Sequence, residues 1–290
     1  MREWRLPPVA WLPAAILPAS MSAAAPHVPA WVFMWLLAGS IFMACKWVMW
    51  MQAIRRGGPA PLSRSVAFLF AWPGMDAEVF LRGSGGPNPL PREWIWAVVK
   101  MLFGAALLWG VARQLGGKLI TGWVGMIGLI FLLHFGSFHA LALGWRTAGI
   151  PVKPLMNQPL AARSLGDFWG RRWNVAFNEL AELLVFQPLV RKAGVHWASL
   201  AAFGFSGVIH DVVISVSARG GYGLPTFYFL VQGIGLWIER SALGRRCGLR
   251  RGWRGWVFTV LVVAGPAYWL FHPPFVERIV LPMMADLNAL

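Results

Sequence analysis

The sequence is poor in cysteine and in acidic side chains, with two Cys and 11 Asp or Glu among 290 residues. Cys45 falls inside a long apolar run and Cys247 lies in an arginine-rich stretch, so we predict no disulfide. His134 and His139 are five residues apart and point to different faces of one helix. Because no cluster of metal-ligating residue types is present, we also predict no metal site.

Charged residues make up only 13% of the chain and hydrophobic residues 58%, which excludes an ordinary soluble domain. A bilayer core about 30 Å thick is crossed by roughly 20 apolar residues of helix. The apolar runs of suitable length lie at 7–25, 29–53, 94–112, 119–143, 196–217, 223–239 and 255–272. We therefore predict an all-α, polytopic bundle of about six to eight transmembrane helices that forms a single membrane domain over residues 1–290.

Residues 1–28 allow two interpretations. Arg2 and Arg5, an apolar stretch and the small residues "SAAA" are typical of a signal peptide. The four prolines between Pro7 and Pro18 fit an irregular first span equally well. We favour a retained span.

Basic residues are distributed unevenly between the loops. If the N-terminus is cytoplasmic, 20 of the 26 Lys and Arg residues lie in cytoplasmic segments, chiefly 55–92, 146–192 and 240–254, and four lie on the other side. Lys46 and Lys100 fall within spans, and we expect both to snorkel toward the cytoplasmic interface. Because the net charge of +15 sits in loops between spans, we expect membrane lipids as partners and no nucleic acid.

The segment 164–184 has the pattern of an amphipathic helix at the cytoplasmic interface. Ser164 and Asp167 resemble a capping box, and large apolar residues recur at helical spacing from Leu165 to Leu184. The opposite face carries a polar stripe of Arg171, Asn174, Asn178 and Glu182. This stripe is either a solvated face or one wall of a water-filled cavity.

The stretch "FGFSGVIHD" (203–211) places His210 and Asp211 deep in an apolar run. If the helix starts near His196, His210 lies about 21 Å along it. An ionisable group inside the membrane costs about 2.5–3.5 kcal/mol, so the pair indicates a site. Asp211 points about 100° away from its neighbour, and we expect it to bond another helix. A neutral His210 can act as a general base, whereas Ser206 is expected to bond within its own helix.

Several motifs now carry a resemblance to a known family. "SLGDFWGRRWN" (164–174), followed by "SGVIHD" (206–211), resembles the wax synthase branch of the membrane-bound O-acyltransferase superfamily. "WPGMD" (72–76), "HFGSFHALALGWR" (134–146) and "PLMNQPL" (154–160) are similar to the same branch, so the resemblance covers residues 70–280. The short chain looks like a bacterial-type minimal core, which implies a bacterial inner membrane.

The resemblance implies fatty acyl transfer from acyl-CoA, as co-substrate and without another cofactor, to a lipophilic alcohol. Related diacylglycerol and sterol acyltransferases carry an F-Y-x-D-W-W-N motif ahead of a membrane-embedded catalytic histidine. Phe168, Trp169, Trp173 and Asn174 match that motif and His210 matches the histidine, whereas Arg171 and Arg172 depart from it. The predicted catalytic residues are His210 and Asn174. The predicted substrate-binding residues are Trp169, Arg171, Arg172, Trp173, Asn178, Asp211 and His139.

Two other classes of protein use similar residues. A lipid or small-molecule transporter or flippase also places His and Asp inside the membrane, but it is often built from inverted repeats, and the sequence has none that we detect. An intramembrane hydrolase needs an activated nucleophile or a metal cluster, and neither spacing is present.

Overall fold

The computed structural model describes residues 6–23 and 25–290, and every regular element within these ranges is helical. The all-α prediction is confirmed. The chain divides into two compact units. The first comprises Met1–Phe103 and Phe131–Pro154, and the second comprises Gly104–Ile130 and Leu155–Leu290.

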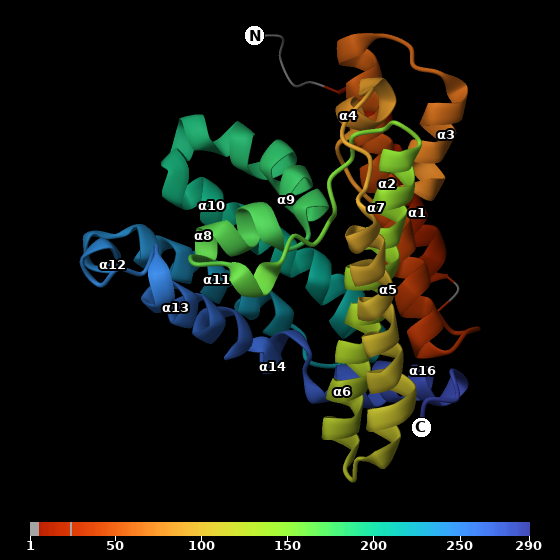
Figure 1. Cartoon of the computed structure of the whole chain (residues 1–290), viewed down its shortest axis with the longest axis vertical. Helices are drawn as coiled ribbons and strands as arrows, with labels where there is room; N and C mark the ends of the chain where they lie inside the picture. The colour runs from red at the N-terminus through yellow and green to blue at the C-terminus, as the bar shows by residue number, and fades with distance from the viewer. Residues whose placement is uncertain (1–5, 24) are drawn as a thin grey trace. The chain divides into compact units, whose positions relative to one another are not determined.

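The first unit is built on a long apolar helix, α2, against which the preceding helix α1 packs (Figure 1). The two interpretations of residues 1–28 remain predictions, since Arg2 and Arg5 lie outside the described residues. The elements of this unit are the 3-10 turn η1 (Pro8–Trp11), α1 (Leu12–Ser22), α2 (Ala30–Gly57), α3 (Leu62–Ala71), α4 (Ala77–Arg82), α5 (Pro91–Ala105), the π-helical turn η4 (Phe131–Ser137) and α7 (Phe138–Thr147).

Two lysines within these helices have partners inside the first unit. Lys46 is fully buried, donates to Gly74 O (2.6 Å) and lies 3.1 Å from the centroid of the Phe68 ring. The prediction that Lys46 snorkels to the interface is therefore wrong, because its ammonium binds a backbone carbonyl of the "WPGMD" segment. Lys100 on α5 lies 3.3 Å from His139 Nδ1 on α7.

The second unit holds the remaining helices, many of them short and joined end to end. They are η2 (Ala106–Val111), η3 (Ala112–Gln114), α6 (Lys118–Ile130), η5 (Pro159–Ala161), α8 (Leu165–Asp167), η6 (Phe168–Arg172), α9 (Val175–Ala181), η7 (Glu182–Phe186), α10 (Gln187–Asp211), η8 (Val212–Val216), α11 (Leu224–Arg240), α12 (Ala242–Arg246), α13 (Gly252–Ala264), α14 (Ala267–Leu270), α15 (Pro273–Phe275), η9 (Val276–Val280) and α16 (Leu281–Asp286). Of the η elements, η2, η6, η7, η8 and η9 are π-helical.

Four helices of the described residues are long and apolar enough to cross a membrane: Ala30–Gly57, Pro91–Gln114, Lys118–Thr147 and Val175–Val216. A fifth candidate is the pair Gly252–Leu270 and Pro273–Asp286, which is bent by 62°. The predicted count of six to eight spans is not confirmed. The segment predicted as a span at 223–239 is helix α11, which has 17 residues and a length of about 26 Å.

The single amphipathic helix predicted over 164–184 is wrong, because the chain breaks in its middle. Trp173 is extended (φ −102°, ψ 122°) and Asn174 is left-handed (φ 41°, ψ 60°), so α9 starts as a new helix. The backbone groups on both sides of the break form hydrogen bonds with the proline-rich segment. Asn157 N donates to Arg172 O (2.8 Å), and Val175 N donates to Leu155 O (3.0 Å). This tertiary pairing replaces the helical hydrogen bonds.

The chain from α9 to η8 forms a helical hairpin that turns at Gly194, whose φ of 77° and ψ of 170° interrupt α10. The ring of Phe177 on the first arm stacks on Phe205 and meets His210 on the second, at 6.3 and 5.8 Å between centroids. In Figure 1 the hairpin lies beside α8 and α11. The span predicted at 196–217 is thus the second arm only.

Candidate active site

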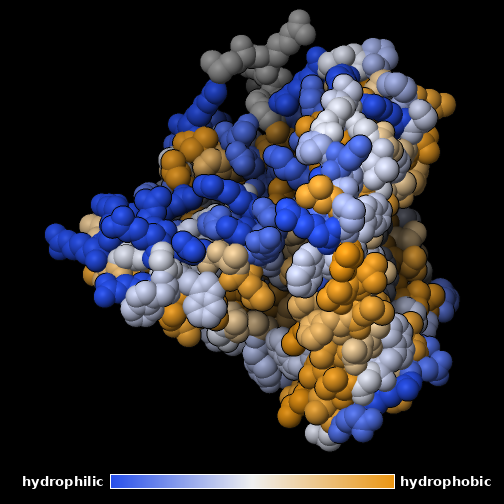
Figure 2. Space-filling view, in the orientation of Figure 1, coloured by the Kyte–Doolittle hydropathy of each residue, from blue (hydrophilic) through white to orange (hydrophobic). Residues whose placement is uncertain are grey.

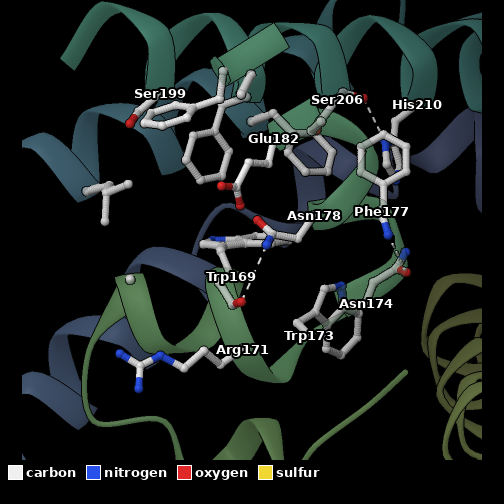
Figure 3. Close-up of a pocket in the computed structure, with 18 of the residues that line it drawn as sticks. Trp169, Arg171, Trp173, Asn174, Phe177, Asn178, Glu182, Ser199, Ser206 and His210 are labelled. Atoms are coloured by element: carbon white, nitrogen blue, oxygen red, sulfur yellow. Dashed lines mark hydrogen bonds between the residues drawn. The ribbon is translucent and has the colours of Figure 1, made fainter. Parts of the chain in front are cut away.

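A cavity of about 300 Å³ lies in the second unit, enclosed by the two arms of the hairpin, the α8–η6 segment and α11 (Figure 3). All four residues of the predicted polar stripe line it. The structure therefore favours the cavity interpretation of the stripe over a face that only contacts solvent. The stripe residues that contribute are Arg171, Asn174, Asn178 and Glu182.

Helix α10 contributes one continuous face to the cavity. Ser199, Phe203, Ser206 and His210 follow one another at intervals of four, three and four residues, which keeps them on the same side of the helix. The 11 residue-to-residue steps from Ser199 to His210 correspond to about 16 Å along the helix axis. In Figure 3, Ser199 and Arg171 lie toward one end of the cavity, and His210 and Asn174 lie toward the other.

The protonation pattern of His210 follows from its hydrogen bond. Its Nδ1 lies 2.7 Å from the backbone oxygen of Ser206, one turn earlier in α10. Because a carbonyl oxygen can only accept, Nδ1 carries the proton and donates it. In a neutral imidazole Nε2 then holds a free lone pair. The rings of Phe177 and Phe229 flank the imidazole at 5.8 and 4.5 Å between centroids.

The two polar atoms of the Asn174 side chain differ in their hydrogen bonding. Its Oδ1 accepts from Phe177 N (3.3 Å) and so caps the start of α9. Asparagine tolerates the left-handed backbone that this position requires. Its side-chain Nδ2 has no acceptor among the described residues, so both amide protons are available to a molecule in the cavity.

The two tryptophans of the motif, Trp169 and Trp173, line the cavity with their aromatic rings. Trp169 Nε1 donates to Gln232 Oε1 (3.3 Å), and the Gln232 side chain in turn donates to Val262 O (2.8 Å). Trp173 stacks on Phe168, with 5.6 Å between centroids and 14° between planes. Gln232 has no exposed surface, so the bond fixes the orientation of Trp169 within a tightly packed region.

Sequence reasoning missed Glu239 and Arg240 at the end of α11. Glu239 is 2% exposed, and its carboxylate accepts from the backbone N–H groups of Leu165 and Gly166 at the start of α8. Arg240 lines the cavity near Leu236 and Gly166. The sequence signal that could have indicated them is two adjacent charged residues, Glu and Arg, directly at the end of an apolar run. A carboxylate that is buried there needs hydrogen-bond donors.

The two adjacent arginines of the motif point in different directions. Arg171 lines the cavity, together with Arg240. Arg172 does not. Its guanidinium pairs with Asp167 (Nε to Oδ2 2.5 Å) and donates to the carbonyls of Asn157 and Gln158 at 3.4 and 3.2 Å. Arg172 thus holds the proline-rich segment against the break.

Two further residues predicted to bind substrate lie elsewhere. Asp211 Oδ2 accepts from Gly223 N (2.7 Å) and Thr226 Oγ1 (2.9 Å) at the start of α11. This confirms the expectation that Asp211 bonds a different helix, and neither partner lines the cavity. His139 belongs to the first unit, where its neighbour is Lys100.

A second serine–histidine contact lies outside the cavity, where Ser215 Oγ is 3.3 Å from His272 Nε2. His272 Nδ1 accepts from Phe275 N (3.2 Å). In the neutral ring the proton therefore sits on Nε2, which donates to the hydroxyl. A histidine that donates cannot deprotonate this serine, so the pair does not have the geometry of an activated nucleophile.

Comparison with known proteins shows which family this region is similar to. Residues 152–231 match the model of the "Membrane bound O-acyl transferase family", and this range contains the break, the hairpin and the start of α11. The long-chain-alcohol O-fatty-acyltransferase of Simmondsia chinensis is 32% identical over 171 residues, which cover 53% of this chain and 48% of that protein. The resemblance to the wax synthase branch of the membrane-bound O-acyltransferases is confirmed.

Two proteins of Arabidopsis thaliana are also similar. A probable long-chain-alcohol O-fatty-acyltransferase 7 is 32% identical over 45% of this chain and 42% of its own length, and an acyl-CoA–sterol O-acyltransferase 1 is 31% identical over 43% and 39%. The chain therefore aligns with about half or less of the length of these relatives. Together with the apolar helices, the matches indicate an integral membrane protein.

Proposed function

We propose that the chain transfers a fatty acyl group from acyl-CoA to the hydroxyl of a lipophilic alcohol, giving a wax ester or another neutral lipid. The observation that carries this proposal is the bond from His210 Nδ1 to Ser206 O. It leaves Nε2 of a cavity-lining histidine able to accept a proton. The relatives named for acyl transfer to long-chain alcohols and to sterols support the same reaction class.

In the proposed reaction His210 Nε2 removes the proton of the alcohol hydroxyl as the oxygen attacks the thioester carbonyl. The carbon–oxygen bond forms and a tetrahedral oxyanion results. When the carbon–sulfur bond breaks, coenzyme A leaves as a thiolate and takes the proton back from the imidazolium. The step balances without an acyl-enzyme intermediate and without a cofactor.

Asn174 is the proposed donor to the oxyanion. Its Oδ1 is committed to Phe177 N, which fixes the amide plane and leaves Nδ2 as the donor. Phe177 also contacts His210, so one residue links the proposed base and the proposed donor. A preorganised donor of this kind contributes about 2.7–4 kcal/mol to the transition state.

The donor is proposed to lie along the α10 face. Arg171 and Arg240 bind its phosphates at one end, and the thioester reaches His210 at the other. The spacing of about 16 Å between Ser199 and His210 is comparable with the extended pantetheine arm that separates thioester and phosphates in acyl-CoA. Asn178, Trp169 and Trp173 line the path between these ends.

The acceptor is proposed to be a lipid-soluble alcohol that enters from the bilayer. A cavity of about 300 Å³ holds the reacting groups but not two long chains, whose tails would extend among the apolar helices.

The finer localisation, a bacterial inner membrane, has no support from these relatives, which are plant proteins. The alternative of a transporter or flippase likewise has no support from them.

The test is turnover of radiolabelled acyl-CoA with a long-chain alcohol by purified protein in detergent. Ester formation and thiol release are measured together, because only an acyltransferase couples them to the alcohol. His210→Ala is expected to lower kcat at least about 100-fold, the lower end of general-base contributions.

His196→Ala is the matched control, since His196 lies on the same helix but outside the cavity, where it stacks on Trp237. It is expected to keep wild-type turnover. Size exclusion reports folding of both variants. Near-normal ester synthesis by a folded His210→Ala protein would remove the histidine from the mechanism.

A further inference from the structure

A cationic and apolar surface lies in the second unit, outside the cavity. It is formed by α12, the start of α13 and the loop at 160–163, and we call it the arginine surface. Its exposed basic residues are Arg163, Arg245, Arg246, Arg250, Arg251 and Arg254. Figure 2 shows the hydrophilic side chains concentrated over α12, on the left of the view.

Among the described residues, none of these arginines forms a salt bridge, and the one carboxylate close enough to interact with the surface is that of Glu239, which acts on Arg250. The sequence has no acidic residue between Arg240 and Val276, and Glu239 is buried and bonded to backbone N–H groups. Asp167 pairs with Arg172. The six exposed arginines therefore exceed the single nearby carboxylate, and the net positive charge of the surface attracts an anionic partner.

Large apolar side chains stand exposed among these arginines: Leu160 (77%), Leu243 (65%), Trp253 (72%) and Trp256 (43%). A binding site for a water-soluble anion does not require large exposed apolar side chains. A membrane interface does, because tryptophan and leucine enter the boundary of the acyl region while arginine holds the headgroups. The mixture thus favours a lipid surface over a soluble anion.

The surface is held rigidly at the point where an apolar helix begins. Trp256 Nε1 donates to Leu160 O (2.8 Å), and a Cβ at Gly255 would meet Arg163 O at 2.1 Å, so α13 packs tightly on the loop. The residues that follow in α13, 257–264, are almost entirely apolar. Headgroups are expected at such a helix entry.

We propose that the arginine surface is a binding site for anionic phospholipid headgroups of the surrounding bilayer. Arg171 and Arg240, which line the cavity, are not part of it. The proposal is independent of the acyl-transfer chemistry, because its readout requires no turnover. Each arginine near an anionic surface is expected to strengthen association up to about fivefold.

The experiment measures lipid selectivity with spin-labelled lipids and the full chain in phosphatidylcholine vesicles. Wild type is expected to retain spin-labelled phosphatidylglycerol severalfold more than phosphatidylcholine in its motionally restricted shell, and added salt should reduce the difference. Changing Arg245, Arg246, Arg250, Arg251 and Arg254 together to Gln should bring the ratio close to one. The matched variant with Lys at the same five positions should retain the selectivity.

Unchanged selectivity in the Gln variant would overturn the proposal, and so would its loss in a folded Lys variant. Displacement of phosphatidylglycerol by free coenzyme A would also overturn it, because the surface would then serve the donor. The depth of the arginine surface in the bilayer is measured with a spin label attached at Leu243→Cys. The labelled protein also carries Cys45→Ser and Cys247→Ser, so that no other cysteine reacts. Oxygen accessibility typical of the headgroup–acyl boundary supports the site, and accessibility typical of bulk water refutes it.

Discussion

The role of Asn174 can be separated into capping and catalysis by three substitutions. Asn174→Ala removes the cap on Phe177 N and places a non-glycine side chain with no polar group in a left-handed conformation. The lost cap costs about 1 kcal/mol and the backbone about 1–2 kcal/mol. Asn174→Gly loses only a few tenths of a kcal/mol at a cap and tolerates the backbone.

Asn174→Asp provides the complementary change. Its carboxylate still accepts from Phe177 N, and a negative charge suits the N-terminus of α9. It cannot donate to an oxyanion. If Asn174 stabilises the transition state, Gly and Asp should both keep near-wild-type thermal stability, while kcat and kcat/KM fall together by about 10²–10³.

The assay is steady-state turnover of acyl-CoA with a long-chain alcohol, with thermal unfolding followed on the same samples. Two results would refute the catalytic role. One is a kcat in Asn174→Gly within about twofold of wild type. The other is a loss of activity only in Asn174→Ala and in proportion to its loss of stability, which would assign Asn174 to the cap alone.

Three further predictions concern the arginines and the topology. The double variant Arg171→Gln, Arg240→Gln should raise KM for acyl-CoA about tenfold or more and leave kcat little changed. The reason is that charge-assisted bonds to the phosphates are made in the ground state and the transition state alike. A KM equal to that of wild type contradicts the proposed binding of the acyl-CoA phosphates. Arg172→Gln should instead lower thermal stability at unchanged KM, because Arg172 holds the proline-rich segment. Cysteine labelling in intact cells or vesicles should place position 246 on the cytoplasmic side and position 219 on the opposite side, because α11 runs between them. Labelling of both from one side would show that the span between them is misread.

Much of the site was predictable because its signals are local. Ionisable residues deep in an apolar run indicated His210, and the 100° angle between neighbours predicted that Asp211 bonds another helix. The polar stripe was visible from helical spacing alone. The capping interaction at Ser164 is present, with Oγ accepting from Asp167 N at 3.0 Å.

The remaining features depend on contacts between distant segments. The break at Trp173 and Asn174 could not be seen, because the apolar period continues across it and the competing hydrogen bonds come from residues 155–157. Lys46 was expected at the interface because the sequence does not show that the carbonyl of Gly74 lies beside it. The turn at Gly194 had a weak signal in the polar stretch "RKAGVH", which interrupts the apolar pattern.

The break also explains how one polar stripe can serve two chemical tasks. Arg171 lies in η6, before the break, and Asn174 opens α9 after it, so the charged end and the proposed catalytic end of the cavity belong to separate elements. An unbroken helix would leave the amide at position 174 without the left-handed backbone that turns its Oδ1 onto Phe177. The same break pairs the backbone of Arg172 with the proline-rich segment, and the guanidinium of Arg172 binds two carbonyls of that segment. Both arginines precede the break, and they have different surroundings because neighbouring residues on a helix point about 100° apart.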